Sequence, residues 1–340
     1  MANQKKSLGL LEKLELCPEY REDGGKTAEV EIGRFKYFRE VSKRRNGPLL
    51  TANLMFLLFL IPLLVLFVLL EVFQGTEGIA YKISNTTATP YLLSGIGFGM
   101  SETTATVLAV KMNILKVYYI IFAALGVCAF IMSIGLGGMT HLSTKFLIGD
   151  TFISKKDNYG NNVPRAIKEF FKGIKRTWKE MLAVGAFFFV LFAGIANIFV
   201  YFIGEYWQKE ANAGHWIMVI LAAIAAISIL MYLVHLIPSI ALYNQTLCGK
   251  MKNSAILSIQ MFVQTLLIAL VLSLPFVIMA VLPLAAMVVI IAVMLCFGSK
   301  WYALSLCNYE QYISEKIISP LYNYKYGKNQ QKAKNKQKRK

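Results

Sequence analysis

Charged residues are scarce in this sequence, and several long segments lack them altogether. Only 16% of the 340 residues are Asp, Glu, Lys or Arg, whereas 56% are hydrophobic and the mean hydropathy is +0.52. Met181–Gly204 and Trp216–Tyr243 contain no Asp, Glu, Lys or Arg. A soluble domain needs polar surface to cover its core, so this composition is typical of a protein that has lipid as its solvent.

Residues and motifs that serve enzymes and metal sites are also scarce. The chain has three histidines and five cysteines, and no two cysteines have CxxC spacing. No P-loop, HExxH or Gly-x-Ser-x-Gly motif occurs, and the apolar segments contain no paired carboxylates. We therefore expect no enzymatic activity, no metal and no other cofactor, and we expect the cysteines to be reduced structural thiols.

The apolar segments predict an all-α, polytopic membrane protein with about six transmembrane helices. A span needs about 20 residues to cross about 30 Å of hydrocarbon, and a helix satisfies every backbone polar group there. The expected spans are about 48–70, 114–137, 181–204, 216–243, 255–279 and 283–306, within a transmembrane domain of residues 48–307. Pro275 and Pro283 suggest the division of the last apolar block, because proline interrupts a helix. A re-entrant hairpin over 255–307 is the alternative.

The basic residues predict the orientation of these spans. Of the 36 lysines and arginines, all but Lys82, Lys111, Lys116 and Lys209 lie in segments that alternate along the chain on one side of the membrane. Cytoplasmic loops carry the excess of Lys and Arg, so both termini are expected in the cytoplasm. Residues 1–47 form the expected cytoplasmic N-terminal segment. Residues 308–340 form a basic cytoplasmic tail, expected to be disordered from about 327. The tail lacks interleaved aromatic residues, so no specific nucleic-acid partner is expected.

Residues 164–180 predict a basic amphipathic helix between the second and third spans. One face carries Ile167, Phe170, Phe171, Ile174 and Trp178, and the opposite face carries Lys168, Lys172, Lys175, Arg176 and Lys179. Such a helix suits the cytoplasmic membrane interface, where its basic residues lie near anionic lipid headgroups. The alternative is a coupling helix that docks on a cytoplasmic partner and transmits its movement to the third span.

Polar side chains within the expected spans are candidate functional residues, because hydrocarbon makes them costly. They are Asn53, Asn197, His235, Gln260 and Gln264. His235 either bonds to a neighbouring span or binds a polar solute or a proton. Gln260 and Gln264 lie one turn apart and predict a seam of hydrogen bonds between helices. Asn53 is expected to cap or bridge helices near the cytoplasmic boundary.

Three glycines lie at the end of the second expected span. Gly135, Gly137 and Gly138 indicate a site where two helices pack closely. An unwound segment that binds a ligand is the alternative interpretation.

Three segments resemble the YesL-like family of bacterial integral membrane proteins. They are Arg45–Pro62 with its Asn53 and Pro62, the glycine-containing Ser133–Gly138, and the Phe-rich basic Ala166–Glu180. The resemblance implies a multi-pass protein of the bacterial plasma membrane. Members of that family often occur beside carbohydrate-uptake systems, which implies an accessory role.

Three hypotheses of function follow. The first is a non-enzymatic membrane protein accessory to the uptake of carbohydrate or another solute, in contact with transporter components. The second is a permease-type subunit coupled to a cytoplasmic ATPase through residues 164–180, or a small solute channel. The third is a membrane enzyme, whose activity would depend on His235 or His141.

Overall fold

Helices make up nearly all of the computed structural model, which describes Leu14 and residues 34–74, 104–148, 154–156, 162–207, 212–281 and 298–321. The elements are α1 (Arg34–Arg44), α2 (Asn46–Gln74), α5 (Thr104–Ile148), β1 (Ser154–Lys156), β2 (Asn162–Pro164), α6 (Ala166–Phe189), the π-helical η2 (Val190–Ile195), α7 (Ala196–Trp207), α8 (Ala213–Leu242), α9 (Leu247–Gln260), α10 (Phe262–Val281), α12 (Ser299–Ile313) and the π-helical η4 (Ser314–Ile318). Strands β1 and β2 form a short antiparallel hairpin before α6. The helical class is confirmed for the described residues.

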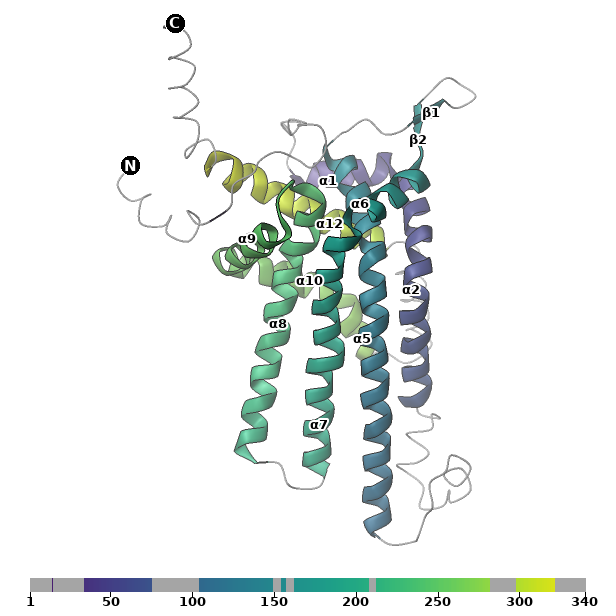
Figure 1. Ribbon diagram of the computed structural model, residues 1–340, viewed down its shortest axis with the longest axis vertical. Coiled ribbons are helices and arrows are strands. Elements are labelled where there is room, and N and C mark those ends of the chain that lie inside the picture. Colours follow the sequence, from purple (N-terminus) through teal and green to yellow (C-terminus); the bar gives the residue numbers. More distant parts are fainter. Residues whose placement is uncertain are drawn as a thin grey trace, which may run out of the picture.

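The long helices run side by side, and one end of the molecule is packed more densely than the other. Figure 1 shows α2, α5, α7 and α8 lying lengthwise, with α1, α9 and α12 gathered at the end where α6 begins. The core at this end includes Val41, Leu142, Phe170, Leu236 and Leu304, which come from five different helices. We call this region the packed end.

Away from the packed end, the helices expose apolar side chains. Helix α8 is buried continuously from Leu233 to Leu242, but its first half is largely exposed. The large exposed hydrophobic residues of that half are Trp216, Ile217, Ile220, Leu221, Ile224 and Ile227. An apolar surface of this extent suits contact with lipid or with another protein.

Three described helices are long and apolar enough to cross a membrane. They are Leu115–Ile148, Ala166–Tyr206 and Ala213–Leu242. A fourth is added if Leu247–Gln260 and Phe262–Leu274, which meet at 98°, form one broken span. The described part of the protein therefore contains helices that could cross a membrane.

No break separates the amphipathic segment expected at 164–180 from the span expected at 181–204. Helix α6 starts at Ala166 and continues through η2 into α7, so that Ala166–Tyr206 forms one helical run of 41 residues. The physical reason is local, because Lys179, Glu180 and Met181 are all good helix formers and no glycine or proline stands among them. The amphipathic segment is thus the first half of a long helix and not a separate one.

Helices α5 and α6 approach each other closely through glycines. A Cβ atom added at Gly138 would lie 2.7 Å from Cε2 of Phe170, and one at Gly173 would lie 2.7 Å from Cβ of His141. The hydroxyl of Ser133 donates to the carbonyl of Met181 at 3.1 Å. Helix α5 is continuous through Gly138, so the unwound segment considered as an alternative is not present.

The straight span expected at 255–279 is not present, because the chain bends sharply within it. Helix α9 begins after Thr246, whose side-chain oxygen accepts from the Gly249 N–H, and so it occupies most of the loop expected at 244–254. Met261, with φ −105° and ψ 31°, ends α9, and α10 then passes through Pro275. The bend lies at Met261, whereas the division expected near Pro283 borders residues 282–297, which lie outside the described residues.

The final described helix runs on beyond the last expected span. Helix α12 and η4 continue to Ile318, so the first part of the tail expected at 308–340 is helical and largely buried. Residues 282–297, which hold much of the span expected at 283–306, lie outside the described residues, as do 75–103 and the tail from residue 322.

Candidate functional site

A chain of hydrogen bonds centred on His235 joins three helices inside the packed end. Nδ1 of His235 on α8 lies 2.9 Å from Oε2 of Glu310 on α12, and its Nε2 lies 2.9 Å from Oγ1 of Thr265 on α10. The Thr265 hydroxyl is in turn 3.3 Å from the hydroxyl of Tyr309. We call these four residues the His235 chain.

Three residues of the His235 chain are fully buried, and Tyr309 is partly buried. His235, Thr265 and Glu310 have no exposed surface, and the second oxygen of Glu310, Oε1, makes no hydrogen bond within the described residues. The ring of Tyr309 lies 5.5 Å from that of His235. Burial raises the pKa of Tyr309, outweighing its hydrogen bond with Thr265, which acts in the opposite direction.

The His235 chain can exist in two hydrogen-bonding states. An ionised carboxylate only accepts, so Nδ1–H of His235 donates to Glu310 when that residue is ionised. If the imidazole is neutral, Nε2 accepts from the Thr265 hydroxyl. If the imidazole is protonated, Nε2–H donates to the oxygen of Thr265. A single proton therefore sets the direction of the bond between α8 and α10.

The order of hydroxyl, imidazole and carboxylate is also that of a nucleophile, a general base and the residue that orients it. Thr265, however, is fully buried, and Tyr309 occupies a position beside its hydroxyl. A substrate would have to reach the hydroxyl through packed core. The geometry thus favours a role in joining helices and holding a proton over nucleophilic attack.

A second buried ionic cluster joins α5 to α6. Nζ of Lys145 lies 3.1 Å from Oε2 of Glu169, and Nε2 of His141 lies 3.7 Å from the same oxygen. Glu169 is fully buried and belongs to the face of α6 that packs on α5. Lys250 of α9 similarly donates to Glu180 of α6 at 2.5 Å. A buried charge left unpaired is strongly destabilising, so these pairs hold the packed end together.

Asn53 bridges α2 and the start of α12. Its Oδ1 accepts from the Ser299 hydroxyl and, at 3.1 Å, from the backbone N–H of Lys300. Gly298, which precedes α12, has no side chain that could cap the helix, so Asn53 supplies the cap from another helix. The side chain of Lys300 donates to Asn46 near the start of α2.

The other intramembrane candidates have different surroundings. Nδ2 of Asn197 donates to the carbonyl of Ala193 at 2.8 Å, within the π-helical part of the chain, where the regular bonding pattern is interrupted. Gln260 and Gln264 are both exposed and lie on opposite sides of the bend at Met261. Because of this bend, the two glutamines do not share one helix face as the sequence predicted, and the expected seam of hydrogen bonds between helices stays a prediction.

Some apolar residues of the amphipathic segment lie in the core, and others are exposed at the surface. Phe170 is fully buried against α5 and Ile174 is half-buried, whereas Ile167, Phe171 and Trp178 are exposed by 48%, 46% and 42%. Basic residues of the same helix stand beside these three, namely Lys168, Lys172, Lys175, Arg176 and Lys179. We call Ile167, Phe171 and Trp178 the α6 stripe.

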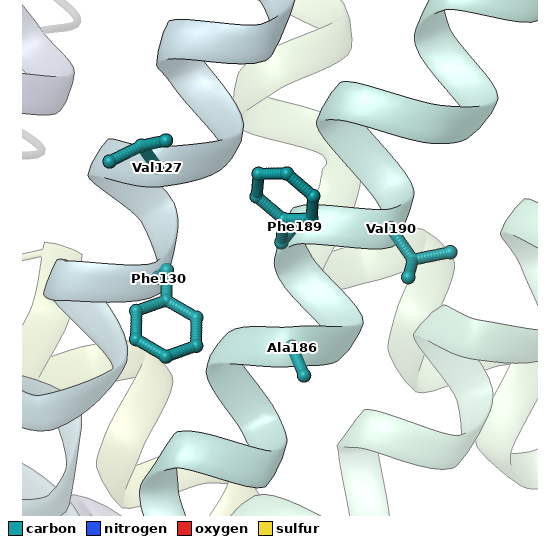
Figure 2. A pocket seen from close by; sticks show the side chains of 5 residues that line it. All are labelled: Val127, Phe130, Ala186, Phe189 and Val190. Atoms are coloured by element: carbon teal, nitrogen blue, oxygen red, sulfur yellow. The ribbon is translucent and has the colours of Figure 1, made fainter.

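An apolar hollow lies between α5 and the junction of α6 with η2. It has a volume of about 370 Å³ and is lined by Val127, Phe130, Ala186, Phe189 and Val190. Figure 2 shows Val127 and Phe130 on one helix facing the helix that carries the other three. The lining has no ionisable group, so the hollow suits an apolar chain rather than a polar substrate.

The sequence indicated His235 but missed its partner. Glu310 was assigned to the tail, because the apolar block was taken to end at Cys307. The helical pattern actually continues, since Ala303, Cys307, Glu310 and Ser314 all lie on the buried face of α12 and η4. That spacing was the signal that could have placed Glu310 in the core.

Among the described residues, no group of three or more His, Cys, Asp or Glu side chains could hold a metal ion.

Comparisons with protein-family models, with curated proteins and with solved structures found no match, so the resemblance to the YesL-like family stays a prediction.

Proposed function

We propose that this chain is a six-span protein of the bacterial plasma membrane with both termini in the cytoplasm, and that it is a non-enzymatic accessory component of solute uptake. The distribution of Lys and Arg supports the orientation. The resemblance of Arg45–Pro62 and Ala166–Glu180 to YesL-like proteins supports the link with uptake of carbohydrate or another solute.

The observation that carries this proposal is the α6 stripe and its place on an unbroken helix. Three large apolar side chains and several cations share the surface of α6, and the same helix continues to Tyr206. Aromatic residues beside cations suit a surface that binds either anionic headgroups or a protein. A force applied to the stripe would act directly on the membrane part of the helix, because no loop intervenes.

The continuity of this helix also supports a second candidate. A permease-type subunit moved by a cytoplasmic ATPase needs a rigid connection between its docking surface and a span. Ala166–Tyr206 offers such a connection. Both candidates place a partner at the α6 stripe, and they differ in whether that partner drives transport.

Replacing Phe171 and Trp178 together with alanine should release transporter components that co-purify with the protein. The two side chains are exposed by 46% and 42%, so the protein should still fold while the binding surface is lost. The measurement is quantitative mass spectrometry of proteins and lipids purified with the full chain in mild detergent.

The matched control is Phe189→Ala, which removes an aromatic side chain of similar exposure (42%) from the other part of the same helical run. Loss of an ATPase together with its transport activity would favour the permease subunit. Loss of a non-ATPase transport component would favour the accessory role. If the double variant keeps every partner and loses only anionic lipid, the docking proposal is wrong.

The orientation predicts which side of the membrane each cysteine faces. Native Cys248 is exposed and lies in the segment expected in the cytoplasm, whereas Asn212 precedes α8 on the opposite side. In intact cells, a membrane-impermeant maleimide should modify an Asn212→Cys variant at position 212 and leave Cys248 unmodified until the cells are opened. Peptide mass spectrometry identifies the labelled positions, and the reverse result would overturn the orientation.

A further inference from the structure

Among the described residues, few polar contacts join helix α10 to other helices. It follows the 98° bend at Met261 and exposes large apolar side chains along its outer face. These are Phe262, Val263, Leu267, Leu270, Val271 and Leu274. Thr265 bonds to His235 and Tyr309, and the carbonyl of Leu272 accepts from the Tyr302 hydroxyl at 2.5 Å.

Both sides of the bend are attached to α8. The hydroxyl of Ser258, before the bend, donates to the carbonyl of Met231 at 3.2 Å. Thr265, one turn after the bend, bonds to His235 one turn further along α8. The Thr265 contact is therefore the point at which α8 determines the direction taken by α10.

We propose that His235 and Glu310 form a proton-binding site that latches α10 to α8 and α12. The site is enclosed, so its net charge decides how well it tolerates burial. With Glu310 ionised and His235 neutral, the site carries one negative charge and Oε1 makes no hydrogen bond within the described chain. One additional proton makes the site neutral overall, whether it resides on the imidazole or on the carboxyl group.

Neighbouring charges do not replace this proton. On α12, the titratable side chains near Glu310 are Cys307, Tyr309 and Tyr312, none of which can carry a positive charge. Among the described residues, the buried cations at the packed end are engaged elsewhere: Lys300, ten residues before Glu310 on α12, donates to Asn46, and the others face different carboxylates. Lys145 and His141 of α5 face Glu169 of α6, and Lys250 of α9 faces Glu180 of α6.

The proton transfer involves no other reactant. A proton from water binds Nε2 of His235, whose Nδ1–H continues to donate to Glu310. The hydrogen of the Thr265 hydroxyl then turns away from Nε2 toward the oxygen of Tyr309, and Tyr309 O–H turns away from Thr265. On release, the same proton returns to water and each hydroxyl turns back.

The sign of the pH effect follows from the charge of the enclosed site. The packed arrangement is neutral with one additional proton, so the latch is complete while the site holds that single proton. Raising the pH removes the proton and leaves a buried net charge, which water can relieve only if the helices separate. We therefore expect α10 to become more mobile as the pH rises.

Electron paramagnetic resonance of the full chain in lipid nanodiscs tests this inference. A nitroxide is attached at Leu267→Cys on α10, with Cys17, Cys128, Cys248 and Cys296 replaced by Ser and the buried Cys307 retained. Between about pH 4 and about pH 9, which brackets the ordinary ranges of a carboxyl and an imidazole group, the label should lose its immobilised component. A label at Ile224→Cys on α8 should show no such loss.

Two variants separate the proton site from a general loosening of the fold. Glu310→Gln removes the negative charge and keeps the shape, so the site is neutral once the imidazole has lost its proton, and α10 should be immobilised at high pH, opposite to the parent protein. Thr265→Val removes the bond to His235, so α10 should be mobile at every pH. If the label in the parent protein does not respond to pH, or if Glu310→Gln responds in the same way as the parent, the proposal is overturned.

Discussion

Replacing His235 with alanine should lower the free energy of unfolding by about 3–5 kcal/mol, which is the cost of leaving a buried charge without its partner. Glu310 is fully enclosed, and the imidazole at 2.9 Å is the one partner recorded for its carboxylate within the described residues. The loss can be measured as a shift in reversible denaturation in detergent micelles. This change should exceed those caused by substitutions on the exposed apolar surface.

Two further variants test whether the unpaired charge of Glu310 causes the loss of stability in His235→Ala. Thr265→Val removes the hydroxyl that bonds to His235 and Tyr309 and should cost only about 2 kcal/mol, at about 1 kcal/mol for each bond. The double variant His235→Ala with Glu310→Gln contains no charge at this place, so it should recover part of the stability that His235→Ala loses. If His235→Ala costs no more than Thr265→Val, the pair contributes no more than an ordinary hydrogen bond.

Replacing Gly138 with alanine should lower the free energy of unfolding by about 1–3 kcal/mol, the usual cost of overpacking a core. The added Cβ would lie 2.7 Å from the ring of Phe170 and 2.9 Å from its backbone oxygen, so the backbone of α6 would have to move. The same denaturation measurement reports the change. Helix propensity alone predicts the opposite sign, since alanine is the better helix former.

Gly47 provides the matched control for Gly138. It lies in the first turn of α2, and a Cβ added there meets nothing within 4 Å. Gly47→Ala should therefore leave stability unchanged or raise it by up to about 1 kcal/mol. Equal effects at the two positions would mean that α5 and α6 do not pack at the distance described.

The sequence predicted well those helices that depend only on their own residues. Helix α8 agrees closely with the span expected at 216–243, because an uninterrupted apolar run leaves few alternatives and the capping box of Asn212 and His215 defines its start. The close approach of α5 and α6 was likewise indicated by Gly138. Both signals are local and can be read without knowledge of the fold.

The bend between α9 and α10 could not be predicted in this way. Gln260, Met261 and Phe262 are all compatible with a continuous helix, and no proline or glycine stands among them. The bonds from Ser258 and Thr265 to α8 keep the two arms at their angle. Because these bonds join residues distant in the sequence, the pattern of the local segment does not reveal the bend.

Of the two central residues of the candidate site, His235 could be predicted from the sequence and Glu310 could not. A histidine in an apolar segment is conspicuous, and His235 was therefore identified from the sequence. Glu310 follows several polar residues and looked like the start of a soluble tail. Its burial depends on the packing of α12 against α5 and α8, which places Cys307 beside Thr144 and Glu310 beside His235.

The unbroken run Ala166–Tyr206 has a consequence for the height of the protein above the bilayer. At about 1.5 Å per residue, its 41 residues extend about 60 Å, which is twice the thickness of about 30 Å of a hydrocarbon core. It packs against α5, which has 45 residues, so if the proposed spans cross a bilayer, both helices extend beyond its hydrocarbon core. Trp178 lies about 16 Å further along the axis of α6 than Ile167. One end of the α6 stripe can therefore rest among lipid headgroups while the other reaches a protein in the surrounding water.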